Sequence, residues 1–274
     1  MLRKAVLLSK GFIEFAAILY RRRSLIFEMA KRDISTQHVG SMLGFFWTFV
    51  NPLIMIFILW FVFSFGFKAS PKGNVPYVVW LTAGMAAWNT FSEIISGATG
   101  VIIGNAHLVK KVVFPLSILP VVKLVASLIT HAIFIALLIG LILLYHRPIS
   151  VFWLQGLYYF FAMGVLALGV SWITSSVNVF ARDTAQIVGV ILQFGFWATP
   201  IFWDLSILPR NVQPILKLNP MFYVVQGYRD SFIYSVPFWQ HWQMTLYYWG
   251  FTGVAFVTGA VIFLRLRPHF ADVL

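Results

Sequence analysis

The side chains that could perform catalysis or bind a metal are few in this sequence and widely separated. There are eight acidic residues and no cysteine, and the acids include no close pair suited to acid–base chemistry. The six histidines are also scattered, at His38, His107, His131, His146, His241 and His269. Neither a GxxxxGKS/T phosphate-binding loop nor an HExxH zinc motif occurs. The sequence therefore predicts a chain that is not itself an enzyme and that holds no metal or cofactor.

The composition is that of a membrane protein. Of the 274 residues, 60% are hydrophobic and only 10% are charged, with a mean hydropathy of +0.86, whereas soluble domains average about 25% charged residues. The formal charge of +12 does not indicate nucleic-acid binding, because the cations flank apolar segments as membrane anchors do.

Six charge-poor segments predict about six transmembrane helices in an all-α fold. A crossing needs about 20 predominantly apolar residues. The segments are 43–67, 75–100, 113–145, 149–177, 187–203 and 244–264. We expect a single domain over 1–274, in which 1–42 is an N-terminal cytoplasmic segment, 43–264 is the membrane region and 265–274 is a cytoplasmic tail.

The distribution of cations predicts the orientation. With the N-terminus in the cytoplasm, 14 Lys and Arg residues lie on the inner side and six on the outer side, as the positive-inside rule favours. Both termini are then cytoplasmic. The loop that carries Lys110 and Lys111 also faces the cytoplasm.

Two regions do not have the pattern of simple crossings. Residues 12–31 place apolar side chains on one helical stripe beside an arginine cluster, which predicts an amphipathic helix at the inner interface. Residues 204–243 contain four prolines between apolar pieces too short to cross. These pieces predict re-entrant or outer-surface helices.

Polar side chains inside the predicted crossings allow two interpretations. Trp47 and Asn51 lie one helical turn apart, and Gln193 and Trp197 share one face of the fifth segment. Such faces can pack helices together through amide hydrogen bonds, or they can form the wall of a polar path. Glu93, the one acid within a predicted crossing, either pairs with a cation near the inner interface or has a proton- or substrate-linked role.

Two cytoplasmic connections look like docking points for a soluble partner. The first, "NAHLVKKVVFPLSILP", contains the Lys110–Lys111 pair, and the second, "NVFARDTAQ", contains Arg182 beside Asp183. Alternatively, the lysines serve only to fix the orientation of the chain.

Three segments together resemble one transporter family. "KRDISTQHVGSMLGFFWTFVNPLIM", "NAHLVKKVVFPLSILP" and "LNPMFYVVQGYRDSFIY" are similar to segments of the ABC-2 type membrane subunits that export bacterial cell-surface polysaccharides. The resemblance implies a homodimer that works with two copies of a cytoplasmic ABC ATPase, which binds ATP and Mg²⁺. It further implies a multi-pass protein of the bacterial inner membrane whose substrate is a lipid-linked polysaccharide, and we expect O-antigen.

The resemblance also implies roles for individual residues. The cytoplasmic connections become coupling helices on the ATPase, and the 204–240 region becomes a set of outer gate helices. The coupling residues would be Asn105, Leu108, Lys110, Lys111, Arg182 and Asp183. The gate residues would be Pro214, Pro220, Tyr223, Arg229 and Asp230.

A polymer of sugars requires a wet or amide-lined path, because a buried hydroxyl without a partner costs roughly 2–7 kcal/mol. Six crossings are few to enclose such a path, which favours a channel between two subunits. Its candidate lining residues are Trp47, Asn51, Asn89, Gln193 and Trp197. The alternatives are a proton-coupled flippase or secondary transporter, which would need more intramembrane ionisable groups than Glu93, and a multispan transferase acting on a lipid-linked sugar.

Overall fold

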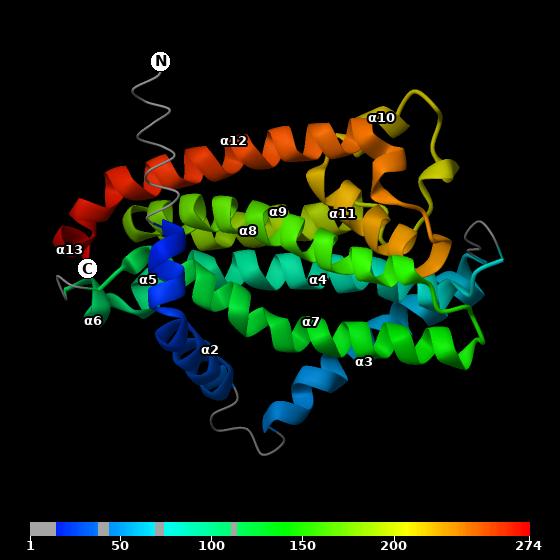
Figure 1. Ribbon diagram of the computed structural model, residues 1–274, viewed down its shortest axis with the longest axis horizontal. Coiled ribbons are helices and arrows are strands. Elements are labelled where there is room, and N and C mark those ends of the chain that lie inside the picture. The colour runs from blue at the N-terminus through cyan, green and yellow to red at the C-terminus, as the bar shows by residue number, and fades with distance from the viewer. Residues whose placement is uncertain (1–14, 38–43, 69–73, 111–113) are drawn as a thin grey trace.

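The computed structural model describes residues 15–37, 44–68, 74–110 and 114–274 (Figure 1). Within these residues every regular element is a helix. The long helices are α2 (Arg23–Gln37), α3 (Trp47–Phe61), α4 (Tyr77–Thr99), α7 (Leu119–Leu144), α8 (Gln155–Phe180), α9 (Thr184–Ala198) and α12 (Trp242–Leu266). The short helices are α5 (Val101–Gly104), α6 (Ala106–Val109), α10 (Gln213–Lys217), α11 (Pro220–Arg229) and α13 (Phe270–Val273).

Single turns extend or join several of these helices. The π-helical turn η2 (Val62–Gly66) continues α3, and a second π-helical turn, η6 (Asp230–Tyr234), continues α11. The 3₁₀ turns are η1 (Gly44–Phe46), η3 (Leu116–Ile118), η4 (Val151–Leu154), η5 (Leu205–Ile207), η7 (Phe238–His241) and η8 (Arg267–His269).

Four helical segments in the described part of the chain are long and apolar enough to cross a membrane. They are Trp47–Gly66, Leu116–Leu144, Val151–Phe180 and Phe238–Val273. Helix α4 is long enough, but polar side chains such as Asn89 and Glu93 lower its hydropathy. Helix α9 has 15 residues, or roughly 22 Å at 1.5 Å per residue, which is shorter than a hydrocarbon core of about 30 Å. The all-α multi-pass architecture is confirmed, and the count of six crossings stays a prediction.

The N-terminal helical region extends further than the predicted interface helix. Residues 15–21 are helical, and α2 runs on to Gln37, beyond the predicted end at residue 31. Ile26 and Ala30 of α2 are buried against Val121 and Val122 of α7, whereas Phe27 is exposed. One face of α2 therefore packs on the bundle, and its placement at a membrane interface stays a prediction.

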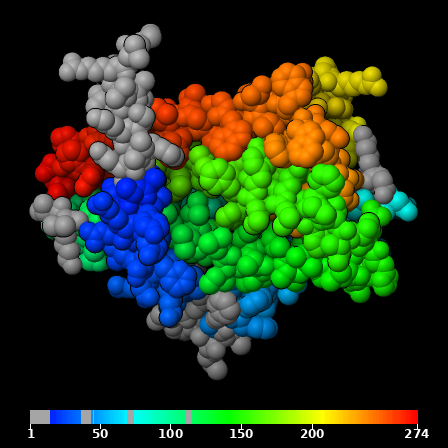
Figure 2. All heavy atoms as spheres, viewed as in Figure 1, coloured from blue at the N-terminus to red at the C-terminus, as the bar shows by residue number. Residues whose placement is uncertain are grey.

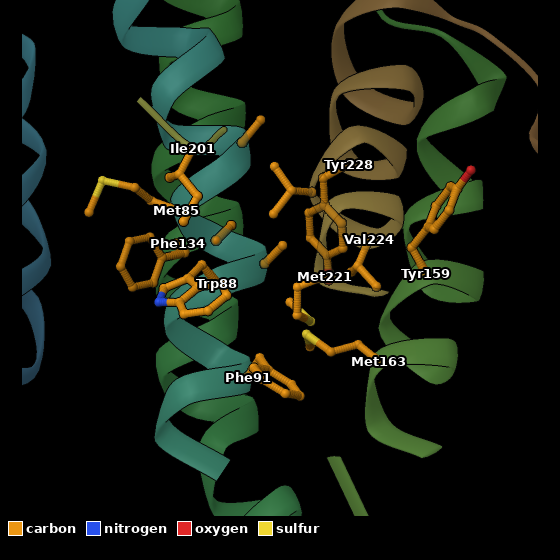
Figure 3. Packing of buried hydrophobic residues seen from close by; sticks show 14 of the residues in the cluster. Met85, Trp88, Phe91, Phe134, Tyr159, Met163, Ile201, Met221, Val224 and Tyr228 are labelled. Carbon is orange, nitrogen blue, oxygen red and sulfur yellow. The ribbon is translucent and has the colours of Figure 1, made fainter. Parts of the chain in front are cut away.

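Helix α4 is the centre of the bundle and contacts α3, α7, α8, α9 and α11 (Figure 1). Leu81, Ala83, Met85 and Ala87 are completely buried, as expected of a helix surrounded by others. Figure 3 shows Met85, Trp88 and Phe91 of α4, with Met221, Val224 and Tyr228 of α11 and Tyr159 and Met163 of α8, in this core.

Helices α8 and α12 approach each other backbone to backbone. A Cβ atom on Gly259 would lie 2.1 Å from the carbonyl oxygen of Gly169. A Cβ atom on Gly169 would lie 2.8 Å from the backbone of Phe256. Small residues commonly permit such close crossings between membrane helices, and here only glycine fits at both positions.

The two ends of the bundle carry different elements (Figures 1 and 2). Helices α5, α6 and α13 and the α8–α9 turn lie at one end, with the C-terminus. Helix α10 and the start of α12 lie at the other end. At the first end, the Asn178 side-chain amide donates a hydrogen bond to the Thr99 carbonyl oxygen at 3.1 Å, which joins the end of α8 to the end of α4.

Candidate functional site

A cavity of about 830 Å³ lies between α3, α4, α7 and the end of α2. Three of the five predicted lining residues, Trp47, Asn51 and Asn89, border it. Trp47 and Asn51 come from consecutive turns of α3, and Asn89 comes from α4. The helical spacing seen in the sequence therefore brings these three side chains to one hollow.

The α4 side of this cavity is polar over about two turns. Asn89, Ser92, Glu93 and Ser96 all border it. Thr130 of α7 donates a hydrogen bond to the Glu93 carboxylate at 3.3 Å, and the Asn89 amide donates to the Met85 carbonyl oxygen at 2.9 Å. These polar groups could hydrogen-bond water or a hydroxyl-rich ligand inside a bundle that is otherwise apolar.

An ion pair closes one side of the cavity. The Lys123 ammonium group of α7 pairs with the Asp33 carboxylate of α2, and both side chains are about one-fifth exposed. This pair connects the N-terminal helix to the bundle across a separation of 90 residues. From the sequence, Lys123 counts only among the inner-side cations and Asp33 has no assigned role, although a lysine near the start of an apolar helix signals that a partner is needed.

The other two predicted lining residues lie elsewhere. Gln193 and Trp197 are on an exposed face of α9, and Trp197 is 55% exposed. Trp197 packs edge-on against Phe202, with ring centroids 4.9 Å apart. Within one chain the five predicted residues therefore do not share one hollow, and a channel lined by all five between two subunits stays a prediction.

The two predicted coupling connections meet at the same end of the bundle. Asn105 and Leu108 belong to the α5–α6 region, and Lys110 ends α6 with its side chain exposed. Arg182 and Asp183 are exposed between α8 and α9. The Asn105 amide donates to the Val101 carbonyl oxygen at 2.9 Å. Lys111 lies outside the described residues.

Prolines begin both helices of the predicted gate region. Pro214 lies in the first turn of α10 and Pro220 in the first turn of α11, where the missing N–H would have had no helical partner. The Asn219 side chain accepts a hydrogen bond from the Met221 amide at 3.0 Å and so caps α11. The prolines thus start short helices here, at the end of the bundle opposite the coupling connections (Figure 1).

Arg229 is the most deeply buried charge in the described chain, with 2% of its surface exposed. Its guanidinium donates to the carbonyl oxygens of Pro200 at 2.8 Å and Ile201 at 2.7 Å. The guanidinium carbon lies 3.4 Å from the centroid of the Trp80 ring, a cation–π contact. Gly84 makes room for it, because a Cβ atom there would lie 2.9 Å from Arg229 Nη2.

Tyr223 and Asp230 have internal polar partners as well. The Tyr223 hydroxyl lies 3.0 Å from the hydroxyls of both Tyr158 and Thr245. The Asp230 carboxylate accepts from the Gln226 amide at 2.9 Å and lies 3.4 Å from His241 Nε2. Because these groups are satisfied within the fold, they connect α11 with α8 and α12 and do not line the α3–α4 cavity.

Comparisons with known proteins agree with this arrangement. The model of the family described as ABC-2 type transporter matches residues 24–233. The "O-antigen export system permease protein RfbA" of Klebsiella pneumoniae is 28% identical over 254 residues, which cover 91% of this chain and 95% of the relative. The protein of the same name from Myxococcus xanthus is 28% identical over 222 residues, covering 78% of this chain and 82% of the relative. Since the family match extends over more than half of the sequence, the chain belongs to the ABC-2 type transporters.

Proposed function

We propose that this chain is the permease subunit of an ATP-driven exporter that moves a lipid-linked polysaccharide, O-antigen, across the bacterial inner membrane. The match to O-antigen export permeases over 95% of their length carries this proposal. The polar cavity between α3, α4 and α7 supports it, because an apolar bundle that only packed against lipid would have no need of such a surface.

The orientation is proposed from the two ends of the bundle. Lys110, Arg182, Arg265 and Arg267 belong to the end that holds α6, α13 and the α8–α9 turn, and this end faces the cytoplasm with both termini. The α10–α11 region, with Arg210 and Lys217, faces outward as the gate. Helices α4 and α9 complete six crossings.

Two copies of the chain are proposed to enclose the export path. Helix α3 exposes Phe57 and Phe61, its extension η2 exposes Phe65, and α9 exposes Phe194 and Trp197. Both helices contact α4, and Phe63 of the α3 crossing lies against Phe202 just beyond α9, with ring centroids 5.0 Å apart. A second copy placed against these helices would add the Gln193–Trp197 face to the wall that begins with Trp47, Asn51 and Asn89.

ATP hydrolysis is assigned to a separate ABC ATPase present in two copies, with ATP and Mg²⁺ bound there. The predicted coupling residues, Asn105, Leu108, Lys110, Lys111, Arg182 and Asp183, are proposed to contact that subunit, and of these Lys110, Arg182 and Asp183 are exposed in the described structure. This division of labour agrees with a sequence that contains no phosphate-binding loop.

Deletion of the gene in its host tests the function. We expect the surface polysaccharide to disappear, the lipid-linked polymer to accumulate on the cytoplasmic face, and the chain expressed from a plasmid to restore display. Immunoblots of intact and permeabilised cells measure both pools. Unchanged surface display in the deletion strain would contradict the proposal.

A further inference from the structure

A second cavity adjoins the first on the side of the coupling connection. It has a volume of about 620 Å³ and is bordered by α2, the end of α4, α5, α6 and the start of α7. Asn105 and Leu108 of the coupling region are part of its wall. The second cavity therefore lies between the cytoplasmic end of the bundle and the larger cavity beside Asn89.

The two cavities meet at three residues that border both, namely Asp33, Gly97 and Lys123. The Lys123 side chain passes over Gly97, where an added Cβ atom would lie 3.4 Å from Lys123 Cδ. At its tip it pairs with Asp33 of α2. Among the described residues, the boundary between the two cavities is therefore formed by the Lys123 side chain, its partner Asp33 and Gly97.

Glycines widen the wall on the cytoplasmic side of this partition. Gly100 and Gly104 border the second cavity, and a Cβ atom on either would meet nothing within 4 Å. The open space continues from the α5 region toward Lys123. Helix α2, which carries Asp33, packs chiefly on α7, so a small shift of α2 relative to α7 would separate the ion pair without disturbing the core around α4.

The charges of the two walls indicate the kind of ligand that fits. Among the described residues, and with Asp33 and Glu93 ionised, the larger cavity has a formal charge of −1, and Arg32 in the smaller cavity brings the sum for both cavities to zero. The larger cavity therefore offers a phosphate group no net positive charge. The amides, hydroxyls and one tryptophan of the two walls suit the hydroxyls and ring faces of uncharged sugars.

We propose that the two cavities form one passage through which an uncharged, hydroxyl-rich stretch of saccharide enters from the cytoplasmic end, and that the Asp33–Lys123 ion pair closes its narrowest point. The assignment of saccharide rests on the proposed export function. The closure by the ion pair does not, and it can be measured in the absence of polymer and ATP.

The experiment uses the cysteine-free chain with one new thiol, Ser92→Cys. This thiol lies in the larger cavity, beyond the Asp33–Lys123 ion pair as approached from the cytoplasmic end. The complex is placed in inside-out vesicles and treated from the cytoplasmic side with a small, cationic, membrane-impermeant methanethiosulfonate. We expect slow modification when the ion pair is intact. Adding Asp33→Asn should raise the rate about two- to fivefold, the change in open population that a partly exposed ion pair can control.

The positive charge of the reagent makes this result diagnostic. Removing the Asp33 carboxylate makes the passage less negative, which by charge alone would slow a cationic reagent. A faster reaction in Asp33→Asn therefore reports opening. Asp33→Glu and the exchanged pair Asp33→Lys with Lys123→Asp should both return the rate to its low value, and Asp272→Asn, which removes an exposed carboxylate elsewhere at the same end, should not change it.

Three results would overturn the proposal. These are an equal or lower rate in Asp33→Asn, a rate that stays high in Asp33→Glu although the complex elutes as folded protein, and equally fast modification of Ser92→Cys from the outer side. If the labelling behaves as expected but deletion of the gene leaves polysaccharide display intact, the closure by the Asp33–Lys123 ion pair is supported and the proposed export function is wrong.

Discussion

Helix α4 has a tightly packed flank and a hollow one. Toward α8 and α11, Gly227 lies so close to Tyr159 that an added Cβ atom would be 2.1 Å from the ring, and Val224 and Tyr228 are completely buried (Figure 3). Toward α3, the same helix borders a polar cavity of about 830 Å³, and only 17% of the residues in the most apolar stretch of Trp47–Gly66 are buried.

We interpret this difference as a division between a flank that supports the fold and a flank that forms part of the proposed export path. The α8–α11 flank has backbone contacts, stacked rings and a buried arginine, which together hold one arrangement. The α3 flank has polar groups around open space and few partners within the chain, so it can accept a ligand, a second copy or a displacement. Substitutions on the α8–α11 flank should therefore reduce the amount of folded protein, whereas substitutions on the α3 flank should reduce export.

The largest effect is expected at the α8–α12 crossing. Gly259→Leu would drive a side chain into the backbone of α8 at Gly169, and overpacking costs about 1–3 kcal/mol or more where backbone must move. We expect little folded protein in the membrane, measured by detergent extraction and size-exclusion chromatography. Gly253→Leu on the same helix is the matched control, since a Cβ atom there meets nothing within 4 Å; equal yields of the two variants would contradict a fixed crossing.

The next largest effect is expected at Arg229. Arg229→Met leaves the Pro200 and Ile201 carbonyl oxygens without their side-chain donor, at a cost of about 1–3 kcal/mol for each unsatisfied group. The variant should unfold at a lower temperature in a thermal melt, and Arg229→Lys should recover only part of the loss because a lysine cannot reproduce the planar fork. Arg210→Met, at an exposed position, should melt like the parent; identical melting of the Arg229 variants would show that this contact does not stabilise the α10–α11 region.

Much of the architecture could be predicted from the sequence because it depends on local composition. Four crossings follow from long apolar runs, and the starts of α10 and α11 follow from Pro214 and Pro220. The predicted interface helix ended too early, at residue 31, because the polar residues that follow gave no sign that α2 would continue to Gln37. Packing on α7, which is distant in sequence, supports that extension.

The site was only partly predictable, because helical periodicity identifies faces but not which faces meet. Trp47, Asn51 and Asn89, three of the five candidate lining residues, border one cavity, and their role in a channel stays a prediction. Gln193 and Trp197 have equally regular spacing, yet their face of α9 is exposed. The Asp33–Lys123 pair joins residues 90 positions apart, and no spacing rule could have paired them.

Export assays test whether Trp47 and Trp197 border the proposed export path. Trp47→Ala and Trp197→Ala remove partly exposed rings, 41% and 55% exposed, so both should leave yield and basal ATP hydrolysis of the complex largely intact. If Trp47 borders the path within one chain and Trp197 borders it from a second copy, each change should slow polysaccharide export several-fold. Trp239→Ala, which removes an exposed ring beside the start of α12, is the control. Wild-type export in both alanine variants would show that the path runs along other faces.

The smallest effect is expected at the coupling end, where exposed charges meet the proposed ATPase. Lys110→Glu reverses a charge at the exposed end of α6, and rim charges affect association rates and their salt dependence more than they affect folding. We expect the purified permease to melt normally, and we expect ATPase capture to weaken about two- to threefold at low salt, with a smaller difference at high salt because exposed pairs are screened. Arg267→Glu reverses a charge at the same end but outside the two connections. If it weakened capture as much as Lys110→Glu, the effect would belong to the overall field of that face, and the α6 connection would lose its special role in coupling.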